Sequence, residues 1–308
     1  MTEAWIAARF LHFASAMAAF GIGAFRVYAF AGGAIPADAP ARIALDARLR
    51  QAMLIAAGLA LLTALAIVPP IAVEMTGSAA AVLDPGVWHA VLFETEFGTV
   101  WCWHMGAAAA LVALCVMQRR RWQAGAATLM ALLLLASLGL TGHAAMDMGG
   151  GFGHEINQMT HLTAAGLWLG GLVPLGLLLR RAVRPDGAAY VPLARAALPH
   201  FSQIGYAAVA LLVITGTVNS IMLVGSFTAL VSTPYGRLLS LKIVLFLAMV
   251  GLAFVNRFRL MPRLSRPETA TTPLRTLCRS VAAEQALGLA ILAVVAVLGT
   301  WPPANMAM

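Results

Sequence analysis

Eight long apolar segments divide this chain and leave it few possible folds. Each is close to the roughly 20 residues that a helix needs to cross the hydrocarbon core of a bilayer. Lipid offers the backbone no hydrogen-bond partner, so such segments have to be helical. We therefore predict an all-α, polytopic membrane bundle that forms a single integral membrane domain over residues 1–308. Its helices are expected at about 5–30, 51–72, 98–118, 124–142, 156–179, 204–228, 238–261 and 281–300.

The composition agrees with this prediction. Hydrophobic residues make up 61% of the chain and charged residues 10%, whereas soluble domains carry about 25% charged residues. The first segment begins with Glu3 instead of a basic cluster, and its apolar run continues to about residue 31. We therefore expect a retained helix there and not a cleaved signal peptide. The three cysteines lie at different predicted depths, which does not suggest a disulfide framework.

The basic residues predict how the bundle lies in the membrane. Arginines are concentrated in the connections after the first, third, fifth and seventh segments, while residues 73–97 and 143–155 contain no Lys or Arg. Cytoplasmic loops are enriched in Lys and Arg. Both termini are therefore expected on the outer, periplasmic side. The net charge of +8 follows from this topology and does not predict nucleic-acid binding.

The histidines gather towards the predicted outer side. At a rise of about 1.5 Å per residue, His12, His104 and His161 lie roughly 7–10 Å inside the outer boundary on three different helices. His143 ends the fourth segment, and His154 lies in the loop that follows. Ionisable residues within membrane spans are rare and usually functional or paired. These five imidazoles are therefore candidate metal ligands.

Two methionines lie between His143 and His154 along the chain. Met146 and Met148 precede a run of glycines that would let the loop fold around an ion. Thioether and imidazole ligands suit Cu(I), and imidazole also suits Cu(II), zinc and haem iron. Methionine also fills gaps between apolar helices, so the loop as a whole, more than either thioether alone, predicts a copper-collecting site.

Helical periodicity indicates where these side chains point. His161 shares a face with Asn157 and Trp168, which places a polar outer mouth above small residues and an aromatic floor. His104 is rotated by about 100° from Met105. We therefore expect that these two side chains do not bind the same ion.

Small and charged residues within the spans predict helix contacts. Gly166 and Gly170 form a small-xxx-small pattern, which is typical of close helix packing in membranes. Lys242 and Glu284 lie about 18 Å apart along the membrane normal and are not expected to pair. Glu284 is expected to form a structural ion pair with Arg257. Lys242 is expected to extend towards the outer boundary or to repel cations as part of a gate.

Motifs across nearly the whole chain resemble the copper resistance D family of bacterial inner-membrane proteins. The matching stretches are ARFLHFASAMAAFG at 8–21, ETEFGTVWCW at 94–103, GHAAM at 142–146, HLTAAGLWLGGLVPL at 161–175, TGTVN at 215–219, TPYGRLLSLK at 233–242 and NRFRLMP at 256–262. The resemblance implies copper transport or delivery in the inner membrane, for copper homeostasis or resistance. It also implies a periplasmic copper-binding partner of the copper resistance C type.

The family pattern falls on particular residues of this chain. Those that it implies as metal ligands, or as structural or gating polar groups, are His12, His143, His161, Asn219, Lys242, Asn256, Arg257 and Glu284. The sequence contains neither a nucleotide-binding loop nor the aspartate motif of a phosphorylated pump. We therefore expect a protein that is not an enzyme, with transport that is passive or coupled to a gradient or a partner.

Two other hypotheses remain open from the sequence. A b-type redox protein could use His12 with His161, or His104 with His143, as axial haem ligands. An assembly or partner-docking protein that binds no metal is the third possibility. The methionine-rich loop favours copper, because a haem protein has no need of it.

Overall fold

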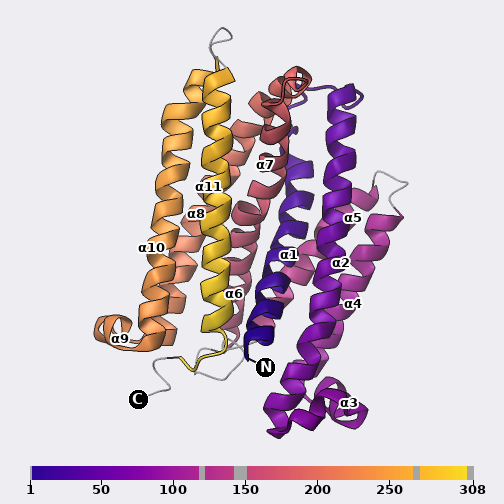
Figure 1. The fold of residues 1–308 in the computed structure, drawn as a ribbon, viewed down its shortest axis with the longest axis vertical. Coiled ribbons are helices and arrows are strands. Elements are labelled where there is room, and N and C mark those ends of the chain that lie inside the picture. Colours follow the sequence, from indigo (N-terminus) through magenta and orange to yellow (C-terminus); the bar gives the residue numbers. More distant parts are fainter. Residues whose placement is uncertain (1, 118–121, 142–150, 266–270, 304–308) are drawn as a thin grey trace.

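The computed structural model describes residues 2–117, 122–141, 151–265 and 271–303. Within these residues, eight helices are long and apolar enough to cross a membrane, and no strand is formed. The helices run up and down side by side (Figure 1). The predicted all-α class and the eight spans are thus confirmed.

The spanning helices differ from the predicted segments mainly at their ends. They are α1 Thr2–Tyr28, α2 Pro40–Thr76, α4 Glu96–Val116, α5 Trp122–Ser137 with η2 Leu138–Leu140, α6 Gly151–Ala165 continued by η3 Gly166–Gly170 and α7 Gly171–Ala182, α8 Val191–Val224, α10 Pro234–Val255 continued by η5 Asn256–Leu260 and η6 Met261–Ser265, and α11 Thr271–Leu298. Shorter elements connect them: η1 Ala79–Leu83, α3 Pro85–Phe93, η4 Ala188–Tyr190 and α9 Phe227–Ser232.

The largest corrections concern where α2 and α8 begin. The predicted segments began at 51 and 204, whereas the helices begin at Pro40 and Val191. The added turns carry arginines such as Arg42 and Arg195. Hydropathy marks the part of a helix that lies at lipid depth, and a helix can continue beyond that depth with charged side chains.

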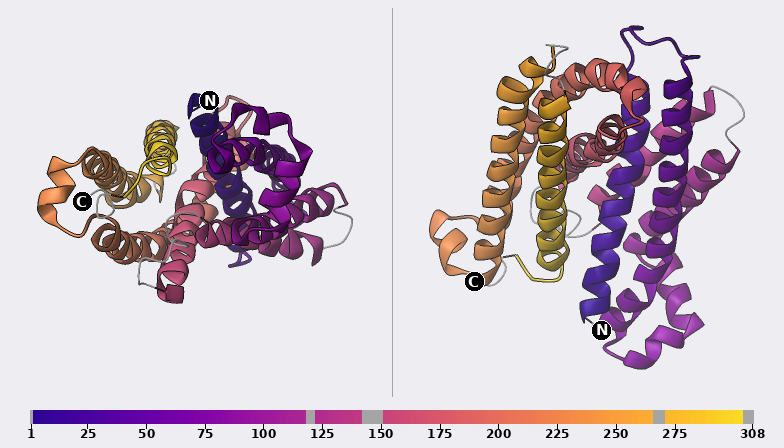
Figure 2. Two further views of the ribbon diagram at one scale, coloured as in Figure 1. Left: turned by 90° about the horizontal axis from the view of Figure 1, so that it is seen from below. Right: turned by 45° about the horizontal axis from the view of Figure 1, so that its top comes forward.

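The two ends of the bundle differ in what they contain. The start of α1 and the end of α11 lie at the same end as α3 and α9 (Figures 1 and 2). We call this the terminal end. The opposite end holds most of the arginines, and there Arg26 pairs with Asp46 at 2.7 Å. We call it the arginine-rich end, which the sequence predicts to be cytoplasmic.

Glycines set the packing at the centre of the bundle. Helix α1 contacts α2, α5, η3, α7 and α11. A Cβ atom on Gly170 would lie 2.0 Å from the carbonyl oxygen of Met17, and one on Gly21 would lie 2.0 Å from the carbonyl carbon of Gly170. The predicted close-packing pattern at Gly166 and Gly170 is therefore confirmed, and α1 is the helix that approaches Gly170.

This contact predicts an unequal response to two matched substitutions. Gly170→Ala places a methyl group against backbone that cannot move aside, and we expect a loss of about 1–3 kcal/mol in stability. Gly106→Ala, on α4, meets nothing within 4 Å and should be neutral or stabilising by up to about 1 kcal/mol. Unfolding in detergent, followed by circular dichroism, checks both. Equal stabilities for the two variants would contradict this packing.

Candidate metal site

Two histidines from separate helices meet inside the bundle. His12 on α1 and His104 on α4 are each only 1% exposed. Their Nε2 atoms lie 2.9 Å apart, and their ring centroids are 4.9 Å apart. His12 lies on the same helix face as Ala16 and Ala19, which are fully buried. The structure therefore brings His12 together with His104, whereas the sequence analysis grouped His12 with His143 and His161 as metal ligands.

Hydroxyl groups on two further helices fix the other ring nitrogens. Thr63 on α2 lies 2.9 Å from Nδ1 of His12, and Ser137 lies 2.8 Å from Nδ1 of His104. Each hydroxyl is also within bonding distance of a carbonyl of its own segment, Leu59 for Thr63 at 2.6 Å and Leu134 for Ser137 at 2.9 Å. Each hydroxyl can therefore accept from the ring N–H while it donates to its carbonyl, or donate to the ring nitrogen instead.

The contact between the two Nε2 atoms is a hydrogen bond. At 2.9 Å one neutral ring donates its Nε2–H and the other ring accepts. A metal ion can take the place of this shared proton once the donating ring carries its proton on Nδ1 and the hydroxyl beside that ring accepts it. Metal–imidazole bonds measure about 2.0–2.1 Å for zinc. Two imidazoles that bind one ion from opposite sides therefore need roughly 4 Å between their nitrogens. The rings would have to move apart by about 1 Å to reach this distance.

Aromatic side chains wall the imidazole pair. The ring of Trp101 stacks on His104, with centroids 4.7 Å apart and planes at 13°, and lies 5.6 Å from His12. Its indole nitrogen donates to the carbonyl of Ala64 at 3.0 Å. Phe97 stacks on the far face of this cluster, 5.3 Å from Trp101. The rings are thus held in place, and the surroundings are apolar.

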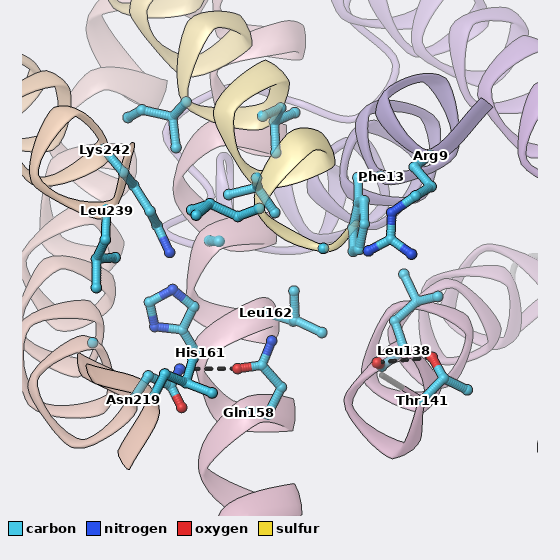
Figure 3. A pocket seen from close by; sticks show the side chains of 18 of the residues that line it. Arg9, Phe13, Leu138, Thr141, Gln158, His161, Leu162, Asn219, Leu239 and Lys242 are labelled. Atoms are coloured by element: carbon cyan, nitrogen blue, oxygen red, sulfur yellow. Dashed lines mark hydrogen bonds between the residues drawn. The ribbon is translucent and has the colours of Figure 1, made fainter. Parts of the chain in front are cut away.

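A cavity of about 1680 Å³ opens beside the pair. Helices α1, α6, α8, α10 and α11 contribute most of its wall. His12, His154 and His161 line it, whereas His104 lies behind His12 and does not. Figure 3 shows the part of the cavity around His161, with Arg9 and Lys242 on opposite sides. An ion in the cavity would therefore reach His12 before His104.

His161 repeats the hydroxyl arrangement of the buried pair. Thr215 on α8 donates to the carbonyl of Leu211 at 2.6 Å and lies 2.9 Å from Nδ1 of His161. When Thr215 donates to its carbonyl, Nδ1–H of His161 donates to Thr215 and Nε2 of His161 carries the free lone pair. An amide network holds α8 in place beside it, because Asn219 bonds to Asn157 at 2.8 Å and to Gln158 at 2.9 Å.

The remaining predicted ligands fall into two groups. His143, Met146 and Met148 lie outside the described residues, so the copper-collecting loop stays a prediction. His154 is 4% exposed, lines the cavity, and its Nδ1 has no hydrogen-bond partner among the described residues. Among the described residues, no three His, Cys, Asp or Glu side chains come close enough together to hold a metal ion.

The predicted partner of Glu284 needs correction. Its carboxylate accepts a hydrogen bond from the Asn256 side chain, and the ion pairs found among the described residues do not include one with Arg257. Asn256 begins the π-helical segment η5, in which each turn holds more residues than an α-helix. This altered register presents Asn256 to Glu284.

The sequence analysis did not identify the hydroxyl residues of the site. Thr63, Ser137 and Thr215 occur in apolar segments where such residues commonly bond to their own helix. Nothing in the spacing along one helix shows that a histidine of another helix lies opposite. The only clue in the sequence was that a buried ligand histidine usually donates its second ring N–H to an oxygen, which a Ser or Thr hydroxyl on another helix can supply.

Comparison with known proteins places this chain in a family. Residues 1–153 match the description "Copper resistance protein D-like, N-terminal domain", and residues 195–298 match "Copper resistance protein D". The chain is 33% identical to "Copper resistance protein D" of Pseudomonas syringae, over 97% of this chain and 96% of that protein. The chain belongs to the copper resistance D family.

Other relatives agree with this membership. "Inner membrane protein YebZ" of Escherichia coli is 32% identical over 97% of this chain and 98% of its own length. "Copper transport protein CutJ" of Bacillus subtilis is 31% identical over 73% of this chain and 40% of its own length. No solved structure gives a significant match. With its eight spans, this member of the family is a multi-pass inner-membrane protein.

Removing one supporting hydroxyl should weaken metal binding without touching a ligand. Thr63→Val keeps the side-chain shape but takes away the acceptor of His12 Nδ1, and we expect a roughly 10–100-fold loss of copper affinity. Competition with a chromophoric Cu(I) chelator measures this loss. Thr128→Val is the matched control, because that hydroxyl bonds to Ala124 of its own helix and should bind copper as wild type does.

Proposed function

We propose that this protein transports or delivers copper at the inner membrane, and that the His12–His104 pair is the site through which the ion passes. The observation that carries the proposal is the contact of the two Nε2 atoms at 2.9 Å, with a hydroxyl on the opposite side of each ring that can accept the proton of Nδ1. Neutral imidazoles are ligands that copper accepts in both oxidation states. Family membership supports copper as the ion.

The cavity supplies a route to this site from the terminal end, which we propose faces the periplasm. Three carboxylates line it there: Glu74 near the end of α2, Glu96 at the start of α4 and Glu155 near the start of α6. Carboxylates concentrate cations at a cavity mouth. His154, with its unpartnered ring nitrogen, is the first imidazole after this rim, and His12 lies further in.

Transfer along this route is an exchange of ligands. Imidazole binds a metal ion as a neutral ligand, so the ion can pass from one imidazole to the next while the protein supplies no new buried charge. We propose that no covalent bond is made or broken, which agrees with a protein that is not an enzyme. The partner that delivers or receives copper at the terminal end would be a periplasmic copper-binding protein of the copper resistance C type.

The geometry of the pair bears on the haem hypothesis. Axial ligation places an imidazole on each face of a porphyrin, whereas His12 and His104 contact each other directly. The haem hypothesis pairs His12 with His161, and both line the cavity, but Nε2 of His12 is bonded to His104 and would have to leave this contact to bind a haem iron. The other pairing, His104 with His143, includes a residue outside the described part of the chain.

Substitution of either member of the pair tests the proposal. In His12→Ala and His104→Ala, one of two ligands is lost, and we expect bound copper to fall at least roughly tenfold. Copper content of the purified proteins and copper accumulation in cells measure the effect. His161→Ala should change accumulation more than binding at the pair, because that ring lies across the cavity.

His200→Ala is the control, since its ring bonds to its own helix at Ala196, away from the cavity. Unchanged copper in both variants of the pair would reject the site. A strong Soret band in the visible spectrum of the wild-type protein would reject the copper proposal in favour of haem.

A further inference from the structure

Lys242 is the starting point for a second site in the same cavity. It lies on α10, about 12 Å along the helix from its first residue, and its ammonium group points into the cavity towards His161 (Figure 3). The ion pairs of the described residues do not include Lys242. A lysine within a membrane span requires a counter-charge or a route to water. The cavity is where that counter-charge would lie.

The cavity wall changes from polar to apolar with depth. Towards the terminal end it carries Gln158, His161 and Lys242. About 10 Å further in, at a rise of 1.5 Å per residue, it is lined by Trp168 and Met249. Trp168 is 1% exposed and contacts the ring of Phe246 edge-on at 5.9 Å. This order, a cationic level above an apolar floor, matches a lipid of the leaflet at the terminal end.

The helices around the cavity give a lipid a way in. Helix α10 packs mainly on α11 and hardly contacts α8, although all three contribute to the cavity wall. In the view from below, α10, α11, α8 and α6 are arranged in a ring (Figure 2), and all four contribute residues to the cavity wall. The weakly packed boundary between α8 and α10 faces outward, so acyl chains could pass it without leaving the hydrocarbon layer.

The volume also exceeds what a copper ion needs. Sites for small molecules occupy roughly 300–1,000 Å³, and this cavity measures about 1680 Å³. An apolar space of that size at membrane depth calls for an apolar occupant.

We propose that the cavity holds an anionic phospholipid, with its phosphate on Lys242 and its acyl chains against the floor at Trp168. Two of the three carboxylates in the cavity, Glu74 and Glu96, stand on the wall formed by α2 and α4, away from α10. The third, Glu155, lies about 9 Å nearer the start of α6 than His161, so none of the three occupies the level of Lys242. The lipid would share the cavity with the proposed copper route, but its phosphate contact is on α10 and not at the His12–His104 pair.

Native mass spectrometry of protein reconstituted with phosphatidylglycerol or phosphatidylcholine of identical acyl chains tests the proposal. Wild type should retain phosphatidylglycerol, and Lys242→Gln should retain at least roughly tenfold less, because a charge-assisted contact to phosphate is lost. Lys242→Arg should restore retention. Arg237→Gln is the matched control, since Arg237 belongs to the same helix and end but is exposed and bonds to the carbonyl of Val231; it should behave as wild type.

Four outcomes would overturn the lipid site: equal retention by Lys242→Gln and wild type, equal retention of phosphatidylcholine, displacement of the bound species by inorganic phosphate alone, or co-purification of haem in the cavity. Copper content measured in the same samples separates this test from that of the copper site. Loss of lipid with unchanged copper supports the lipid proposal and leaves the copper proposal standing.

Discussion

Hydroxyl groups already bonded to their own helices hold the buried imidazoles of this protein. In a bilayer, Ser and Thr commonly return their proton to a backbone carbonyl one turn earlier, and three of them lie within bonding distance of such a carbonyl beside a histidine. A hydroxyl bonded in this way accepts the ring proton at Nδ1 and leaves the lone pair on Nε2, whereas a hydroxyl that donates to the ring leaves the proton on Nε2. The metal chemistry proposed for His12 and His104 depends on this choice, because the two Nε2 atoms share one hydrogen bond and a metal ion needs both lone pairs.

The close approach of helices at Gly170 makes the imidazole arrangement possible. Because α1 lies against the backbone of η3, His12 reaches the middle of the bundle and stands opposite α4. The same contact falls within the π-helical segment Gly166–Gly170. A π turn changes the direction of the side chains that follow, and it lets α6 present His161 to the cavity while α7 continues into the core.

The sequence predicted the membrane architecture well because that architecture depends on single segments. Hydropathy located eight spans. Spacing along the sequence placed His161 and Trp168 on one helix face, and both side chains line the cavity. Contacts between helices were predicted less well. Helical rotation indicated that His104 and Met105 point in different directions, yet the partner of His104, His12, is 92 residues away, and no periodicity records that distance. The sequence paired Glu284 with Arg257, whereas the side chain that bonds to Glu284 is that of Asn256, the residue before Arg257 in the π-helical segment η5.

The unequal packing of the bundle determines which part of it can move. Helix α1 is fixed by glycine contacts and by neighbours on several sides, α11 among them, whereas α10 packs mainly on α11 and hardly contacts α8. Deformation of a structure follows its weakest interfaces. A change in the width of the cavity would therefore be carried by α10, while α1, α4 and the two imidazoles between them keep their positions.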